Sequence, residues 1–167
     1  VEGKGKNMLR LKKINRENVW NILKLEVSDD QKSFVATNGI SIIEAYTAIT
    51  ENGYAFPFAI YEDDTPVGFL MIGFDVYDYW DDAPGIAKGN YNLWRLMIDK
   101  NYQRKGLGKE AVRLALEFIN TFPCGTGEYC WLSYEAENDV ARQLYSSFGF
   151  VETGEKDGEE LIAVLKL

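Results

Sequence analysis

Two periods in the pattern of hydrophobic and polar positions predict the secondary structure of this chain. Runs that alternate, or that are almost wholly apolar, are typical of strands. They fall at residues 9–14, 56–62, 67–74, 93–98 and 129–134, from residue 150, and at 161–167. Helices are predicted at residues 15–27, 41–49, 110–122 and 138–148, where apolar positions have helical spacing. This order of elements predicts a single mixed α/β sandwich.

Local signals place the ends of the helices. Asn15 is expected to cap the first helix. The apolar face of that helix would carry Val19, Trp20, Leu23 and Val27. Ser41 and Glu44 have the spacing of a capping box that opens the second helix. Gly149 can adopt the left-handed conformation that ends the last helix.

Composition narrows the class of protein. The chain has 167 residues, of which 46% are hydrophobic and 14% aromatic, as in an ordinary globular protein. Its formal net charge of −8 argues against binding to nucleic acid or to an anionic membrane and favours cationic partners. No apolar run approaches the ~20 residues of a membrane span and no signal-peptide pattern is present, so a cytoplasmic location is expected. No metal site is expected, because the chain lacks histidine and its two cysteines lack metal-type spacing.

The first seven residues differ from the rest of the chain. Residues 1–7 are rich in glycine and lysine and precede Met8, so we interpret them as an expression remnant or a disordered lead-in. No later linker is long enough to divide the sequence. Residues 8–167 are therefore expected to form one domain.

A basic, glycine-containing turn joins the predicted strand at 93–98 to the helix that follows it. Gly106 and Gly108 remove side chains where backbone N–H groups and the positive end of the helix can meet an anion. The neighbours that add donors and positive charge are Gln103, Arg104, Lys105 and Lys109. The turn therefore predicts a ligand that carries phosphate.

Three phosphate-binding motifs contain closely spaced glycines, and their context separates them. The P-loop is excluded, because Glu110 follows Lys109 and no glycine stands at the upstream position. The dinucleotide fingerprint fits the spacing of Gly106, Gly108 and Ala111. Its context is wrong, because polar residues separate the strand from the first glycine, and the later acids are Glu117 within the helix and Glu128 before the next strand, not an acid at the tip of that strand. The third pattern, Gln/Arg-x-x-Gly-x-Gly/Ala, is matched by residues 103–108.

Two motifs together resemble the GNAT acyltransferase family. Residues 103–108 resemble the acetyl-CoA pyrophosphate loop of that family. Further along, Asn138 opens a helix that contains Tyr145 and ends at Gly149 and Phe150, which is similar to the second hallmark of the family. The motifs stand in the family's order, and the resemblance covers residues 9–167. It is closest to the bacterial spermine and spermidine acetyltransferases.

The resemblance implies a fold and a donor site. The fold would be a mixed, mostly antiparallel central sheet of about seven strands with helices on both faces. The donor would be acetyl-CoA, and coenzyme A would be the product. The residues that would hold it are Leu96, Met97, Ile98, Gln103, Arg104, Lys105, Gly106, Leu107, Gly108, Lys109, Asn138 and Arg142.

The resemblance also implies roles in catalysis. Acetyl would pass to a primary amine by direct attack in a ternary complex, with Tyr145 as the general acid for the leaving thiolate. The alternative for Tyr145 is a structural place on the apolar face of its helix. The oxyanion would be met by the backbone N–H of Met97 or Ile98. The strand at 93–98 contains no acid, so Glu135 or a loop aspartate would relay the proton through water.

The loop at residues 75–92 is the candidate acceptor site. Its carboxylates alternate with aromatic side chains, a combination that suits a flexible cation with several ammonium groups. The predicted contacts are Asp75, Tyr77, Asp78, Asp81 and Asp82, together with Phe34 from a segment that borders the acceptor pocket in the family. The alternative is a solvated acidic loop.

The sequence therefore predicts an N-acetyltransferase that acts on a small cationic amine, with spermidine or spermine as the leading acceptors. Two alternatives stay open. One is an N-acetyltransferase for peptides, proteins or other small amines, and the other is a non-catalytic sensor that binds acyl-CoA. Homodimers are common in the family, so a homodimer is also open.

Overall fold

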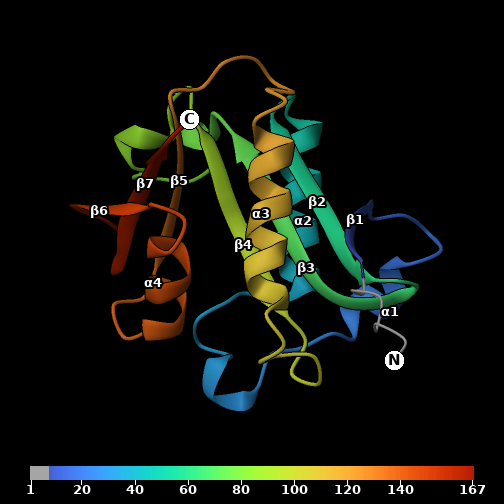
Figure 1. Cartoon of the computed structure of the whole chain (residues 1–167). Helices are drawn as coiled ribbons and strands as arrows, with labels where there is room; N and C mark the ends of the chain where they lie inside the picture. The colour runs from blue at the N-terminus through green and yellow to red at the C-terminus, as the bar shows by residue number, and fades with distance from the viewer. Residues whose placement is uncertain (1–7) are drawn as a thin grey trace.

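The computed structural model describes residues 8–167, and the prediction for residues 1–7 lies outside them. Figure 1 shows the whole chain. The strands are β1 (Leu9–Lys13), β2 (Tyr54–Glu62), β3 (Thr65–Phe74), β4 (Tyr91–Ile98), β5 (Tyr129–Tyr134), β6 (Val151–Asp157) and β7 (Glu160–Lys166). The α-helices are α1 (Val19–Leu23), α2 (Asn38–Thr50), α3 (Leu107–Ile119) and α4 (Asp139–Ser146). Short 3-10 turns lie at η1 (Asp29–Gln31), η2 (Val76–Asp78) and η3 (Gly85–Ala87).

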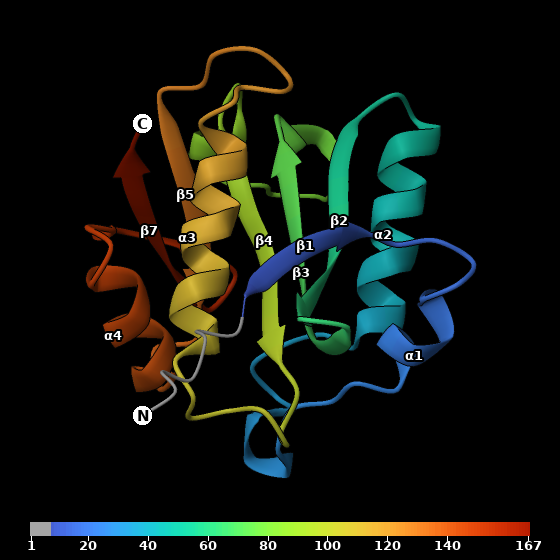
Figure 2. The same ribbon diagram turned by 45° about the vertical axis from the view of Figure 1, so that its right-hand side comes forward.

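The strands form one sheet in the order β1-β2-β3-β4-β5-β7-β6. All neighbouring strands are antiparallel except β4 and β5, which are parallel. Helices α3 and α4 lie on one face of the sheet, and α1 and α2 lie on the other (Figures 1 and 2). The predicted fold, a mostly antiparallel sheet of about seven strands with helices on both faces, is confirmed.

Each face of the sheet buries its own core. On the α3 face, Ala111, Ala115 and Ile119 pack fully buried against strand residues such as Leu70. On the other face, Ile22 of α1 packs with residues of α2 and the strands. Burial of these apolar side chains, at roughly 25 cal/mol per Å², is what holds the helices to the sheet.

The first helix is shorter than predicted, and its buried face was predicted wrongly. The side chain of Asn15 accepts hydrogen bonds from the N–H groups of Glu17 and Asn18, at 2.9 and 3.2 Å, so it closes a turn that precedes the helix. Asn and Asp commonly form such turns, which compete with helix formation. The helix therefore begins at Val19, and Ile22 is fully buried while Trp20 is 69% exposed.

The second helix begins three residues before the predicted capping box. Thr37 is its N-cap, with Oγ1 accepting from the N–H of Ile40 at 3.3 Å. Ser41 is already helical, and its hydroxyl donates to the carbonyl of Thr37 at 3.1 Å. Glu44 is bonded to Arg95 instead of to the start of the helix. The capping-box interpretation is wrong because a threonine that can cap stands earlier in the chain.

The parallel strands β4 and β5 pair only at one end. Their ladder consists of Tyr91 opposite Cys130 and Asn92 opposite Trp131. Beyond this point Trp94 is an extra residue in β4, because the register against β3 shifts between Leu93 and Arg95. The strands then diverge.

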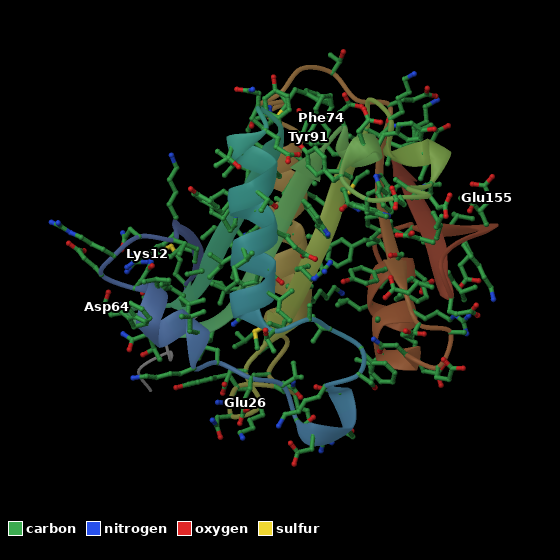
Figure 3. The ribbon with its side chains drawn as sticks, turned by 180° about the vertical axis from the view of Figure 1, so that it is seen from behind. Lys12, Glu26, Asp64, Phe74, Tyr91 and Glu155 are labelled. Carbon is green, nitrogen blue, oxygen red and sulfur yellow. The ribbon has the colours of Figure 1, made fainter. Side chains whose placement is uncertain are left out.

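The two ends of the sheet therefore differ. Figure 3 shows Phe74 and Tyr91 together at the paired end, where their ring centroids are 4.7 Å apart. Glu26 lies at the opposite end, beside the loop that contains η1. The divergence leaves one edge of β4 unpaired toward this second end.

The close packing of β3 on β4 yields a prediction about stability. A Cβ atom at Gly68 would lie 2.4 Å from the carbonyl oxygen of Met97, a backbone atom that cannot move aside. We expect Gly68→Ala to lower the free energy of unfolding by about 1–3 kcal/mol in urea titrations. Gly85→Ala is the matched control, since nothing lies within 4 Å of its Cβ position and its φ is ordinary. Equal stability of the two variants would contradict this account.

Candidate active site

A cleft of about 1480 Å³ opens where β4 and β5 diverge. It is lined by the unpaired part of β4, by the facing side of β5, and by the loop that leads into α3. Residues of α2, α4, the η1 loop, the loop after β3 and the β6–β7 hairpin complete its walls. The cleft therefore passes from one face of the sheet to the other.

The start of α3 presents unpaired N–H groups to this cleft. Gly106, the N-cap, has φ +78°, and no side chain caps the helix. Arg104 also has positive φ, at 63°. Among residues 8–167 the backbone N–H groups of Leu107, Gly108 and Lys109 have no hydrogen-bond partner. A left-handed turn followed by a free helix N-terminus is a site for phosphate.

Positive side chains surround the same place. Arg104 and Lys109 line the cleft and form no ion pair with any described residue. Lys105 does not line it, and its Nζ lies 5.1 Å from the centroid of the Tyr102 ring. Two of the three predicted cationic residues of this loop are therefore free for an anion.

A buried carboxylate holds the beginning of this loop. Asp99 is 4% exposed and directly follows β4. It accepts hydrogen bonds from the N–H of Glu26 and from both the N–H and the side-chain amide of Asn101, each at 3.0 Å. These bonds tie the loop after β4 to the segment between α1 and η1.

Gln103 also has a structural role in the loop. Its side-chain amide donates to the carbonyl of Ile98 at 2.9 Å and to the side chain of Gln31 at 2.7 Å. It lines the cleft, but its amide group already connects the loop to β4 and to η1.

The backbone of β4 turns alternate N–H groups toward the gap. Asp99 N–H donates to Val67 on β3, and a Cβ at Gly68 would touch the carbonyl oxygen of Met97. Because the hydrogen-bonding direction alternates along a strand, Met97 faces β3. Leu96 and Ile98 therefore face the unpaired edge. Of the two predicted oxyanion donors, only Ile98 has its N–H on that side.

Tyr145 reaches the cleft from α4 and is half-buried. Its ring stacks on Tyr134 with centroids 6.0 Å apart and meets the edge of Phe150 at 5.8 Å. Burial raises the pKa of its phenol, and the nearby Cys130 and Tyr134 raise it further. Its hydroxyl makes no hydrogen bond within residues 8–167. The ring of Tyr145 is therefore held by its neighbours, while its hydroxyl remains available as a proton donor at the gap.

A hydrogen-bond network holds the other side of Tyr134. The Tyr134 hydroxyl donates to Glu152 at 2.8 Å, and Arg142 Nε donates to the same oxygen at 2.7 Å. These two bonds lower the pKa of Glu152. Arg142, which was predicted to bind the donor, is thus engaged here and does not line the cleft.

Most of the predicted donor and catalytic residues come together at the cleft. Those that line it are Leu96, Met97, Ile98, Gln103, Arg104, Gly106, Leu107, Gly108, Lys109, Asn138 and Tyr145. Asn138 caps α4 as well, since its side chain accepts from the N–H of Ala141 at 3.1 Å. Glu135, Lys105 and Arg142 are not among the lining residues.

The structure does not bring the predicted acidic acceptor residues to the cleft. Asp75 has φ 52°, and its carboxylate accepts from the N–H of Gly89 at 2.7 Å, so it closes the loop. An adjacent, shallow hollow, which shares Tyr79 and Trp80 with the cleft, is lined by Tyr77, Asp78, Asp81 and Asp82. Phe34, the last predicted contact, does line the cleft.

Other acidic and aromatic residues line the α2 side of the cleft. The carboxylates are Glu44, Glu51, Asp157 and Glu160, and the aromatic rings are Tyr79, Trp80, Trp94 and Trp131. Tyr79 and Trp80 pack against Trp94, with centroids 5.8 and 5.7 Å apart. These residues come from five separate segments, so no local pattern could have grouped them. The signal in the sequence was the pair Tyr79 and Trp80, which stand inside the loop at residues 75–92.

Several polar groups on this side interact with one another or lack a partner. Arg95 donates to both oxygens of Glu44, at 3.0 and 3.3 Å. Trp80 Nε1 lies 3.4 Å from the carboxylate of Asp157, and burial raises the pKa of that carboxyl. Trp131 Nε1 and Arg95 Nε are buried without a hydrogen-bond partner among the described residues. The α2 side thus combines carboxylates, aromatic faces and unused donors.

Two classes of site are not found in the described part of the chain. Residues 8–167 contain no group of three or more histidine, cysteine, aspartate or glutamate side chains that could hold a metal ion. None of the helices in the same range is long and apolar enough to cross a membrane.

Comparisons with family models, curated proteins and solved structures all find acetyltransferases. A model described as the acetyltransferase (GNAT) family matches residues 14–150. The probable spermine N(1)-acetyltransferase of Bacillus subtilis subsp. natto (strain BEST195) and the spermine/spermidine N(1)-acetyltransferase of Bacillus subtilis (strain 168) are each 32% identical over 158 residues, which cover 92% of this chain and 96% of the relative. Aminoglycoside acetyltransferase AAC(6')-Ib in complex with coenzyme A has a TM-score of 0.73, with 95% of each chain covered at 15% identity, and so shares the fold.

The anchor at Asp99 yields a prediction. We expect Asp99→Asn to lower the free energy of unfolding by about 1–3 kcal/mol. Both carboxylate oxygens of Asp99 accept from backbone N–H groups, and the NH2 group of asparagine would leave one of these N–H groups without an acceptor. Asp64→Asn, at a side chain that is 96% exposed, is the matched control and should change stability by less than about 0.5 kcal/mol. Urea unfolding measures both, and an undisturbed Asp99→Asn protein would refute the anchoring role.

Proposed function

The chain belongs to the acetyltransferase (GNAT) family, and we propose that it transfers the acetyl group of acetyl-CoA to a primary amine of a polyamine of the spermine and spermidine type. The observation that carries the proposal is the cleft between the diverging strands. One side of it offers free N–H groups and cations, and the other offers carboxylates and aromatic rings. These two sides suit an anionic donor and a cationic acceptor.

The donor side suits coenzyme A. Its pyrophosphate would bind the N–H groups at the start of α3, beside Arg104 and Lys109. Its pantetheine arm carries amides, which can pair with the unpaired edge of β4 as an added strand would. The thioester oxygen would then meet the N–H of Leu96 or Ile98, which is how an oxyanion is stabilised in acyl transfer.

The acceptor side suits a flexible cation with several ammonium groups. Carboxylates pair with ammonium groups, and the faces of Trp and Tyr attract them within about 6 Å. Glu51 and Asp157 form no ion pair with residues 8–167, so both are available to a substrate. The names of the two Bacillus subtilis relatives favour spermine and spermidine within this class.

The reaction is direct attack of the amine on the thioester. The carbon–nitrogen bond forms, the carbon–sulfur bond breaks, and the thiolate accepts a hydrogen bond or a proton from Tyr145. Burial raises the pKa of this phenol, so Tyr145 stays protonated over the whole pH range in which the enzyme would work.

The first test is release of coenzyme A from acetyl-CoA by the purified protein, with spermidine, spermine, putrescine, an N-terminal peptide and a lysine peptide as acceptors. We expect turnover with the polyamines. Turnover with the peptides alone would overturn the acceptor class. Binding of acetyl-CoA without turnover on any amine would overturn the catalytic proposal.

The role of Tyr145 gives a second test. We expect Tyr145→Phe to lower kcat by about 100-fold, which is typical for loss of a general acid, with the affinity for acetyl-CoA unchanged. Tyr134→Phe is the matched control, because it removes the hydroxyl of the ring that stacks on Tyr145, and that hydroxyl points to Glu152. Steady-state kinetics and calorimetry measure the two effects. Full activity of Tyr145→Phe would remove this residue from the mechanism.

The location of the acceptor side gives a third test. Glu51→Gln combined with Asp157→Asn should raise the KM for spermidine by roughly 10-fold or more, because each charge-assisted contact contributes on the order of 1–3 kcal/mol, and it should leave the KM for acetyl-CoA unchanged. Asp78→Asn combined with Asp82→Asn removes the same charge from the hollow outside the cleft and should leave both constants unchanged. A raised KM for spermidine in the second double variant, with no change in the first, would place the acceptor at the acidic loop.

A further inference from the structure

A serine and a glutamate on the α2 side of the cleft form a pair that the reaction as described above does not use. The hydroxyl of Ser133 on β5 donates a hydrogen bond to the carboxylate of Glu160 on β7, and both residues line the cleft. Ser133 comes two residues after Trp131, where β5 stops pairing with β4. Its hydroxyl therefore stands on the part of β5 that borders the gap.

The pair lies on the opposite face of the sheet from Tyr145. Tyr134, the neighbour of Ser133 in β5, packs with Tyr145 in the core beneath α3 and α4. Because successive side chains of a strand point to opposite faces, Ser133 shares the face of Trp131. A phenol thus stands on one face of the gap, and a hydroxyl bonded to a carboxylate stands on the other.

We propose that Glu160, acting through the hydroxyl of Ser133, is the general base that takes the proton from the attacking amine; this rests on the proposed function. As nitrogen bonds to the thioester carbon, its N–H bond breaks and the proton passes to Ser133 Oγ. The original Ser133 proton passes to the Glu160 carboxylate. The carbon–sulfur bond then breaks with its electron pair on sulfur, which Tyr145 meets from the other face, and Glu160 returns its proton to solvent.

The timing of this transfer follows from acidity. A free alkylammonium group has a pKa near ~10.4, so a carboxylate is a poor base toward it. Once the nitrogen is bonded to the electron-poor thioester carbon, its N–H becomes much more acidic. The carboxylate is therefore suited to take the proton as the new bond forms.

The other carboxylates of the cleft are placed differently. Glu44 accepts both of its hydrogen bonds from Arg95, and Asp157 accepts from the indole of Trp80. Of the carboxylates that line the cleft within residues 8–167, only that of Glu160 accepts a hydrogen bond from a hydroxyl, and this hydroxyl belongs to a strand that borders the gap. Glu135, the base predicted from the sequence, does not line the cleft.

The decisive variant is Glu160→Gln, which keeps the size of the side chain and removes its basicity. We expect kcat to fall by about 100-fold, as for loss of a general base, while the KM values for acetyl-CoA and amine do not change. Glu159→Gln is the matched control. Glu159 is the adjacent residue, lies outside the cleft and pairs with Lys156 at 3.7 Å, so its variant should keep the wild-type kcat.

Variants of Ser133 test the relay itself. Ser133→Ala should lower kcat by roughly 10-fold, less than Glu160→Gln, because a water molecule can take the place of the hydroxyl. Ser133→Thr keeps a hydroxyl and should restore most of the activity. A purely structural role of the hydroxyl would instead shift the unfolding midpoint of Ser133→Ala. If Glu160→Gln fails to fold, this pair of serine variants decides the question.

The outcomes separate this proposal from the function on which it rests. Wild-type protein that turns over no amine would overturn the proposed function and, with it, the base. Wild-type turnover together with an undiminished kcat in Glu160→Gln would overturn only the base. A Glu160→Gln loss that lies wholly in the KM for the amine would also overturn it and would make Glu160 a binding residue.

Discussion

The loss of pairing between β4 and β5 is the constraint on which the site depends. Two ladder pairs join the strands, and beyond Asn92 and Trp131 the sheet opens. Elsewhere an unpaired strand edge inside a protein would be costly, because each buried and unsatisfied polar group destabilises by about 1–3 kcal/mol. Here β3 keeps β4 in place from its other side, and the bulge at Trp94 turns the strand locally. The open edge is therefore held by the fold and is available to a ligand with amides.

The divergence also explains how one cleft has two sides of opposite charge. Because the gap passes through the sheet, its two sides are built by different elements. The start of α3 supplies free N–H groups and a positive dipole end next to Arg104 and Lys109. Side chains of α2, the loop after β3, β4, β5 and the β6–β7 hairpin supply the carboxylates and rings. A protein with a net charge of −8 can in this way bind a polyanionic donor, because positive groups are concentrated at the donor side of the cleft.

The sequence predicted the fold, and most of the residues that it predicted for the donor lie together at the cleft, because both depend on short-range patterns. The glycine turn and the strand–turn–helix around it are contiguous, and Tyr129–Tyr134 is a strand within its predicted bounds. The proposed acceptor side was not predictable in the same way. Glu51, Trp94 and Asp157 are far apart in the chain and meet only through the topology of the sheet. Asp78 and Asp82 looked equivalent to them in composition, but the loop turns these two residues to a hollow of its own. The starts of two helices were predicted wrongly. Asn15 closes a turn, so α1 begins later than predicted, and Thr37 caps α2, so this helix begins earlier than predicted.

The alternation of side chains along β5 links the fold to proton transfer. Amine acetylation must remove a proton from nitrogen and offer one to sulfur. The base and the acid that do this should not exchange their proton directly with each other. In β5 the neighbouring residues Ser133 and Tyr134 point to opposite faces, and each connects to a titratable group on its own face. Glu160 and Tyr145 are thereby separated by the sheet, while both have access to the same gap. In the proposed mechanism, a single strand with its ordinary two-residue period thus places the acid and the base on either side of the reacting carbonyl.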